Sequence, residues 1–142
     1  MSLNLIKLCV GAESLEALQI WGKQRLIDRA KAGEEVCLFH TTRMHPKRAE
    51  ELLDGGSLYW VIKGNIQARQ RLTELRSIVD SEGIRRCKLI LDNEIVPTEW
   101  QPRRAFQGWR YLPVDEAPQD LDSANLSLPG HLRAELAELG LL

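Results

Sequence analysis

The stretch from residue 36 to residue 64 reads VCLFHTTRMHPKRAEELLDGGSLYWVIKG, and it predicts two strands with a short helix between them. Residues 36–44 begin apolar and end polar, which is typical of a strand that leaves the core and opens into a site. Residues 46–53 predict a short helix, because proline is tolerated at the first helical position. A turn at residues 54–56 then leads into an alternating strand at residues 57–63.

Toward the N-terminus, residues 3–10 form a short apolar run that predicts a buried strand. Ser14 can cap a helix that runs to about Lys31, and Gly33 is suited to stop it. Trp21 lies beside the apolar stripe of this helix, so we expect it to pack against the sheet. The stripe consists of Leu15, Leu18, Gly22, Leu26 and Ala30.

On the C-terminal side, the pattern predicts a helix at residues 67–79 and strands at residues 86–91 and 106–112. Residues 96–104 contain two prolines and are predicted to form a loop. The chain is therefore predicted to have an α+β fold, with a mixed or mainly antiparallel sheet of about five strands and three to four helices. A sheet curled into a small barrel is an alternative that stays open.

Charge is distributed unevenly along the chain. Residues 40–110 hold thirteen basic and nine acidic side chains, a balance of +4, whereas residues 111–142 hold one basic and six acidic ones. We expect residues 1–112 to form one globular domain and residues 113–142 an acidic, proline-containing tail. Its short C-terminal helix would carry Leu132, Leu136 and Leu139. Solvated faces and a basic ligand site explain the positive middle about equally well.

The bulk composition fits one soluble domain. The chain has 142 residues, 44% of them hydrophobic, and no apolar run approaches the 18 residues of a membrane span. Cys9, Cys37 and Cys87 are widely spaced inside apolar runs, which is typical of reduced thiols in the cytoplasm. We therefore expect a cytoplasmic protein with no membrane partner.

Basic and aromatic residues recur together in the middle of the chain, and arginine beside an aromatic ring can hold a phosphate while the ring stacks on a base. An anion could also bind at the start of the predicted helix at residues 46–53. The alternative is that these aromatic residues pack in the hydrophobic core and that the cations only surround it at the surface. The candidate binding residues are Arg43, Lys47, Arg48, Trp60, Lys63, Arg69, Arg103, Arg104, Trp109 and Arg110.

Catalytic patterns are incomplete. An unperturbed histidine titrates near neutrality, so His40 is the best candidate for acid–base chemistry. Ser57 follows two glycines, but GxSxG is absent and Ser57 begins a predicted strand, so a lysophospholipase-type hydrolase is not expected. His40 and His45 lie on opposite faces of a predicted strand and cannot jointly hold an ion. We expect no metal and no cofactor.

The segments MSLNLIKLCVGAESLEAL, HTTRMHPKRAEELLDGGSLYWVIKG, QARQRL and VPTEWQPRRAFQGWRYL resemble an uncharacterised alphaproteobacterial family, domain of unknown function 1489. The resemblance covers about residues 1–112. It implies a bacterial cytoplasmic protein and no particular activity. A much weaker similarity joins WVIKGNIQARQRL to PUA-like and ASCH-like RNA-binding barrels. It implies a basic cleft lined by Lys63, Gly64 and Arg69, with Arg43 and Trp60 beside them.

Three functions follow from these features. The leading hypothesis is a non-enzymatic module that binds nucleic acid, most of all RNA, in a basic cleft lined by aromatic residues. The alternative is a small enzyme for a phosphorylated or carboxylated metabolite, in which Arg43, Lys47 and Arg48 bind the anion and His40 moves the proton. A third hypothesis is an interaction scaffold whose acidic tail docks elsewhere or covers the basic site.

Overall fold

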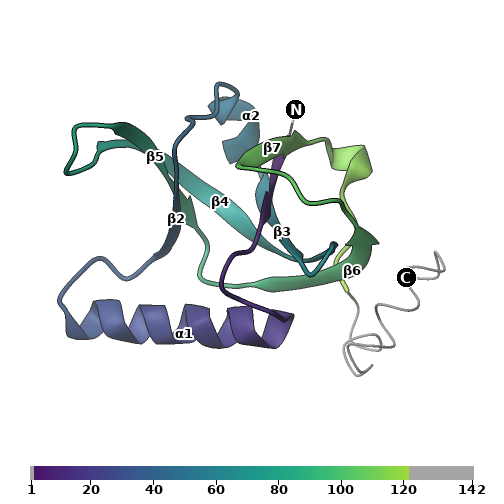
Figure 1. The fold of residues 1–142 in the computed structure, drawn as a ribbon, viewed down its shortest axis with the longest axis horizontal. Helices are drawn as coiled ribbons and strands as arrows, with labels where there is room; N and C mark the ends of the chain where they lie inside the picture. The colour runs from purple at the N-terminus through teal and green to yellow at the C-terminus, as the bar shows by residue number, and fades with distance from the viewer. Residues whose placement is uncertain (1, 122–142) are drawn as a thin grey trace.

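A computed structural model describes residues 2–121 of the chain (Figure 1). Two α-helices and seven strands form one α+β unit. In chain order the elements are β1 (Asn4–Leu8), α1 (Leu15–Lys31), β2 (Leu38–Thr42), α2 (Ala49–Leu53), β3 (Ser57–Ile62), β4 (Asn65–Val79), β5 (Arg85–Leu91), β6 (Val96–Pro102), β7 (Trp109–Leu112) and the 3-10 turn η1 (Val114–Glu116).

The sheet is mixed, in the order β2-β5-β4-β3-β1-β7, and β6 pairs with β4 outside this path. β1 runs parallel to β3, and the other pairs are antiparallel. The parallel pair requires a crossover, which α1, β2 and α2 supply. The α+β class and the mixed sheet are confirmed. The predicted count of about five strands is too low, and the predicted three to four helices exceed the two α-helices found in residues 2–121.

The long strand β4 connects the two parts of the sheet. Its first half pairs with β3 and β6, and its second half pairs with β5. Ile66, Ala68, Gln70 and Leu72 are all buried, which is the two-residue period of a strand. The helix predicted at residues 67–79 is therefore wrong.

Strand β6 replaces the loop predicted at residues 96–104. Pro97 pairs with Ala68 and Pro102 pairs with Asn65. Proline cannot donate a ladder hydrogen bond, but its carbonyl can still accept one, and the Pro97 carbonyl accepts from the Leu121 N–H at 2.9 Å. The two prolines are thus compatible with a strand, and their presence misled the prediction.

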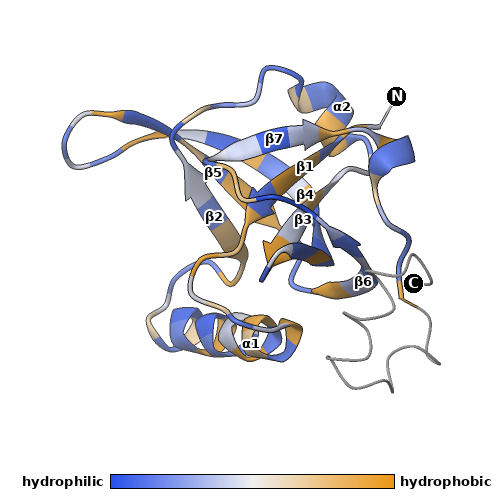
Figure 2. Ribbon diagram, turned by 45° about the vertical axis from the view of Figure 1, so that its right-hand side comes forward, coloured by the Kyte–Doolittle hydropathy of each residue, from blue (hydrophilic) through white to orange (hydrophobic). Residues whose placement is uncertain are grey.

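Helix α1 packs across one end of the sheet (Figures 1 and 2). Ser14 caps it as predicted, because its side chain accepts a hydrogen bond from the Ala17 N–H at 3.1 Å. Leu15, Leu18 and Gly22 are buried, but Ala30 at the end of the predicted stripe is exposed. Only the first half of the helix is therefore well packed on the sheet.

The hydrophobic core lies between α1 and the strands. Leu5, Leu58, Ile62 and Leu89 have no exposed surface. Figure 2 shows β1 and β3 largely in the hydrophobic colour and the loop between β2 and α2 mostly in the hydrophilic one. That loop, polar and at the surface, is where candidate binding residues begin.

The described chain continues past β7 along the sheet. Asp120 forms an antiparallel bridge with Thr98, and Leu121 is buried. The helix expected around Leu132, Leu136 and Leu139 lies outside the described residues. The division of the chain at residue 112 stays a prediction. Within residues 2–121, no helix combines the length and apolar character that crossing a bilayer requires.

Candidate functional site

A cavity of about 110 Å³ lies between α1, the chain that follows β1, and the strands β2 and β3. We call it the α1 cavity. Its walls are mostly apolar or aromatic, with one imidazole and one thiol among them. The lining residues are Cys9, Val10, Gly11, Ala12, Leu18, Trp21, His40 and Trp60.

His40 contributes a neutral imidazole to this cavity. Its ring meets the edge of Trp60, with 5.5 Å between the ring centroids and planes 84° apart. Burial lowers the pKa of His40 from 6.5 to about 4, and the positive charge of Lys7 adds to the effect. Burial also raises the pKa of the Cys9 thiol. At neutral pH the cavity therefore offers uncharged hydrogen-bonding groups and no activated nucleophile.

Trp60 is a structural part of the cavity wall. It is only 4% exposed, and its indole N–H donates to Gln70 Oε1 at 2.9 Å. Gln70 is fully buried and donates in turn to the Asp92 carbonyl at 3.0 Å. The expectation that Trp60 offers an open stacking surface is not met, because the sheet encloses the ring.

The exposed aromatic at the cavity mouth is Trp21. It is 39% exposed, and the Arg25 guanidinium lies 5.6 Å from its ring centroid. The predicted packing of Trp21 against the sheet is wrong, and Arg25 is not among the predicted site residues. Their spacing of four residues on one helix, which places both side chains on one face, was the available signal.

A second hollow, of about 200 Å³, gathers positive charge where the chain leaves β2 beside the β4–β5 hairpin. We call it the arginine pocket, and it is lined by Arg43, His45, Ser77, Arg85 and Arg86. Arg86 is paired with Asp80 at 2.7 Å. Arg43 and Arg85 are exposed and have no carboxylate partner within residues 2–121.

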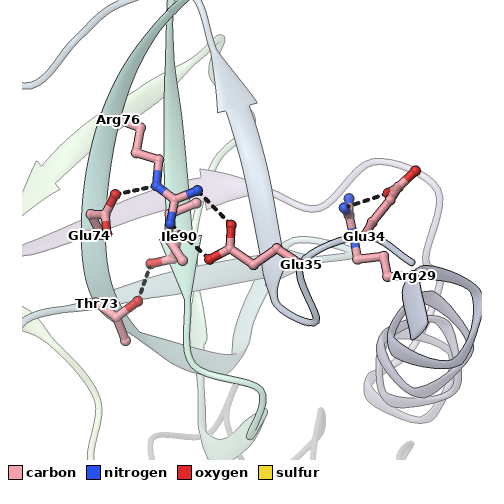
Figure 3. Close-up of polar contacts among 7 residues, drawn as sticks. All are labelled: Arg29, Glu34, Glu35, Thr73, Glu74, Arg76 and Ile90. Atoms are coloured by element: carbon pink, nitrogen blue, oxygen red, sulfur yellow. Dashed lines mark hydrogen bonds and ion pairs between the residues drawn. The ribbon is translucent and has the colours of Figure 1, made fainter. Parts of the chain in front are cut away.

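Two other arginines are neutralised by acidic side chains (Figure 3). Arg76 binds both carboxylate oxygens of Glu35, at 2.8 and 2.9 Å, and also contacts Glu74. Arg29 pairs with Glu34 at 3.2 Å. The arginine pocket is distinguished from this network by the two cations that remain without an acidic partner in the described chain.

The backbone N–H groups of the anion site predicted at the start of α2 already bind a side chain of the protein itself. The backbone N–H groups of Lys47 and Arg48 both donate to the Tyr111 hydroxyl, at 3.0 and 3.2 Å. The Arg48 side chain pairs with Glu51 and lies 5.5 Å from the Tyr111 ring centroid. Because α2 begins only at Ala49 and has five residues, its N-terminus offers little to a ligand.

The remaining predicted residues are spread over other parts of the surface. Arg69 binds Asp120 and Ser57. Arg103 binds Gln101 at 3.0 Å and the Glu116 carbonyl at 3.4 Å.

Arg110 lies 5.0 Å from the Phe106 ring centroid, while Lys63 and Arg104 are exposed. Trp109 is 8% exposed, with its indole N–H bonded to the Met44 carbonyl, so it is no open platform either. The ten predicted residues therefore do not line one common cleft.

Only Arg43 of the predicted residues lines the arginine pocket. Sequence analysis missed Arg85 and Arg86 because they join Arg43 only through the pairing of β2 with β5. No local pattern carries that information. In the described part of the chain, no group of three or more His, Cys, Asp or Glu side chains is placed to hold a metal ion.

Comparison with known proteins gives a family and no activity. The chain matches the family described as protein of unknown function (DUF1489) over residues 5–142. No curated protein and no solved structure matches the chain. The match covers nearly all of the sequence and includes both hollows described above. The chain therefore belongs to the DUF1489 family.

Proposed function

We propose that this protein binds single-stranded RNA, with the arginine pocket holding the phosphate backbone. The observation that carries the proposal is the convergence of Arg43, Arg85 and Arg86 on one hollow, two of them without an acidic partner among residues 2–121. Guanidinium groups match phosphate oxygens with paired hydrogen bonds, and the Ser77 hydroxyl adds a further donor.

The α1 cavity gives the same chain a place for an unpaired base. Trp21 with Arg25 offers an exposed ring and a cation at its mouth, and neutral His40 offers hydrogen bonds inside. Unpaired bases stack on aromatic and guanidinium planes and are read along their edges. His40 and Arg43 are three residues apart on and just after β2, about 10 Å along a strand. We propose that one RNA segment spans both hollows.

The PUA-like resemblance of WVIKGNIQARQRL favours RNA as the partner, but the cleft that it implies around Lys63, Gly64 and Arg69 is not the site proposed here. The bacterial cytoplasmic location that the resemblance to the DUF1489 family implies is also a proposal. We propose no metal or cofactor for this function.

An enzyme acting on an anionic metabolite is the second candidate, because His40 lines a cavity. Two features favour RNA binding over it. The pKa of His40 is lowered to about 4, which makes it a weak proton acceptor at neutral pH. In that enzyme the anion would be bound by Arg43, Lys47 and Arg48. None of these three residues lines the α1 cavity that contains His40.

The test is binding of a short fluorescent RNA of mixed sequence to the full chain, followed by anisotropy at increasing salt. We expect affinity to fall linearly on a log–log plot, since phosphate contacts release counterions. The double variant Arg43→Gln/Arg85→Gln should bind about tenfold more weakly and show a shallower salt slope.

The matched control removes the same charge elsewhere, with Lys23→Gln/Lys31→Gln on α1. This control should keep the affinity within about twofold. Absence of binding at low salt, or an equal loss in both double variants, would overturn the proposal. Trp21→Ala should lower the affinity by about fivefold or more if a base stacks at the α1 cavity.

A further inference from the structure

A third hollow, of about 470 Å³, lies on another part of the surface, between β1, β3, β4 and the chain that follows η1. We call it the Arg69 hollow. Its wall is predominantly polar, unlike that of the α1 cavity, and the RNA contacts proposed above lie at other residues. The polar side chains that matter are Asn4, Ser57, Tyr59, Arg69 and Asp120.

The cation that lines this hollow, Arg69, is already paired with the carboxylate of Asp120. Arg69 Nε and Nη2 contact Asp120 Oδ1 and Oδ2, each at 2.7 Å. These two parallel bonds are the geometry in which arginine recognises carboxylates. The third nitrogen, Nη1, donates to Ser57 Oγ at 3.1 Å, which fixes the plane of the guanidinium.

The groups around this pair are mainly hydrogen-bond donors. Asn4 Oδ1 accepts from the Ser57 N–H at 2.9 Å, which leaves the Asn4 amide NH₂ as a donor toward the hollow. Burial raises the pKa of Tyr59, so its hydroxyl stays protonated at neutral pH. Donors beside one cation suit a small polar anion with more than one oxygen.

Asp120 can release Arg69 without unfolding the segment that carries it. The neighbouring backbone is anchored by hydrogen bonds from Glu99 N to Gln119 O at 2.8 Å and from Leu121 N to Pro97 O at 2.9 Å. Leu121 is buried, whereas the Asp120 side chain is 47% exposed. A rotation of that side chain into solvent would open the guanidinium while the backbone stays in place.

We propose that the Arg69 hollow is a binding site for a small polar carboxylate, and that Asp120 is its built-in competitor. The external carboxylate takes the place of the Asp120 side chain on Arg69 and gains hydrogen bonds from Asn4, Ser57 and Tyr59. Because a tethered group competes at an effective concentration of about millimolar or more, Asp120 weakens the binding of free ligands. This inference is independent of the RNA proposal, which places RNA at other residues.

The experiment uses citrate as the probe and the full chain, with affinity measured by calorimetry. Asp120→Asn keeps the shape of the side chain and removes its charge, so this variant should bind citrate about tenfold or more tightly than the unmodified protein. Arg69→Lys in the Asp120→Asn background keeps the charge but loses the paired geometry, and it should lose about tenfold. Thermal melting of both variants without citrate verifies that they fold.

Two controls make the result decisive. Asp115→Asn removes an exposed carboxylate from η1 and should leave citrate affinity unchanged. Inorganic phosphate should bind the Asp120→Asn variant more weakly than citrate does. Undetectable citrate binding to that variant, binding that Arg69→Lys does not alter, or tighter binding of phosphate would each overturn the proposal.

Discussion

The indole Nε1 of Trp109 donates a hydrogen bond to the backbone oxygen of Met44 over 2.8 Å, which ties β7 to the loop that follows β2. The ring also meets Tyr111 edge-on, with 4.9 Å between centroids. Tyr111 in turn accepts hydrogen bonds from the same loop, at Lys47 and Arg48. Strand β7 therefore holds the loop that begins with Arg43 and His45, two residues of the arginine pocket.

Replacing Trp109 with Phe tests this connection. The variant loses one buried hydrogen bond and part of a buried ring, so the free energy of unfolding should fall by about 1–3 kcal/mol. Urea denaturation measures the change. Trp21→Phe is the matched control. Because Trp21 is 39% exposed, this variant should lower the free energy of unfolding by less than about 1 kcal/mol. Equal costs at the two positions would contradict the structural role of Trp109.

The buried chain from Trp60 through Gln70 to the Asp92 carbonyl gives a second prediction. Gln70→Leu removes both hydrogen bonds and leaves the buried indole N–H of Trp60 without its partner. We expect a loss of about 2–4 kcal/mol in the free energy of unfolding, since an unsatisfied buried polar group costs about 1–3 kcal/mol. The exposed Gln107→Leu should change stability by about 0.5 kcal/mol or less. A Gln70→Leu variant as stable as the parent would show that the network is dispensable.

The same glutamine shows why sequence patterns misassigned β4. Residues 67–79 are rich in Gln, Arg, Leu and Glu, which favour helices in isolation. Pairing with β3, β5 and β6 overrides that preference, and Gln67 and Gln70 are buried because the sheet supplies their hydrogen-bond partners. A buried amide reads as polar surface in a sequence, so the period of two was hidden.

The strands built from apolar alternation, such as β3, and the capped helix α1 were predictable, because local chemistry determines them. The candidate sites were not. Arg43 was selected for its position at a strand end, but its neighbours Arg85 and Arg86 come from a hairpin some forty residues away. Trp60 and Trp109 were selected as open rings, and their burial depends on tertiary packing that composition does not reveal.

The lowered pKa of His40 predicts a pH dependence of stability. Above pH 6.5 the imidazole is neutral in both the folded and the unfolded chain, and its contribution is fully present. As pH falls below 6.5, the unfolded chain takes up a proton that the folded chain resists until about pH 4, so stability declines across this window. One pKa unit corresponds to about 1.4 kcal/mol, and partial solvent screening reduces the total expected loss to about 1–2 kcal/mol.

The measurement is the free energy of unfolding at several pH values for the parent chain and for His40→Gln. Carboxylates also titrate toward pH 4, and the difference between the two proteins isolates His40. We expect the parent to lose more stability than His40→Gln between pH 6.5 and 4. NMR titration of the imidazole gives the pKa directly, and a value near 6.5 would refute the buried, neutral state.

Gly56 supplies the last prediction, because its backbone lies against two other segments. Its N–H donates to the Leu52 carbonyl at 3.0 Å, and its own carbonyl accepts from the Leu72 N–H at 2.9 Å. A Cβ added at this position would overlap the backbone oxygens of Leu3 and Leu52. Those oxygens belong to main chain that cannot turn aside, so Gly56→Ala must displace the junction of β1, α2 and β3.

We expect Gly56→Ala to cost more than about 3 kcal/mol or to prevent folding, as overpacking against backbone does. Gly55→Ala is the matched control in the same turn. Its φ of +84° disfavours a side chain, but the nearest atom to an added Cβ is the flexible Ser2 hydroxyl at 3.8 Å. Strain alone should cost Gly55→Ala about 1 kcal/mol. Thermal denaturation compares the stability of the two variants. If Gly55→Ala were the less stable variant, the close approach of backbone atoms would not explain the need for glycine at position 56.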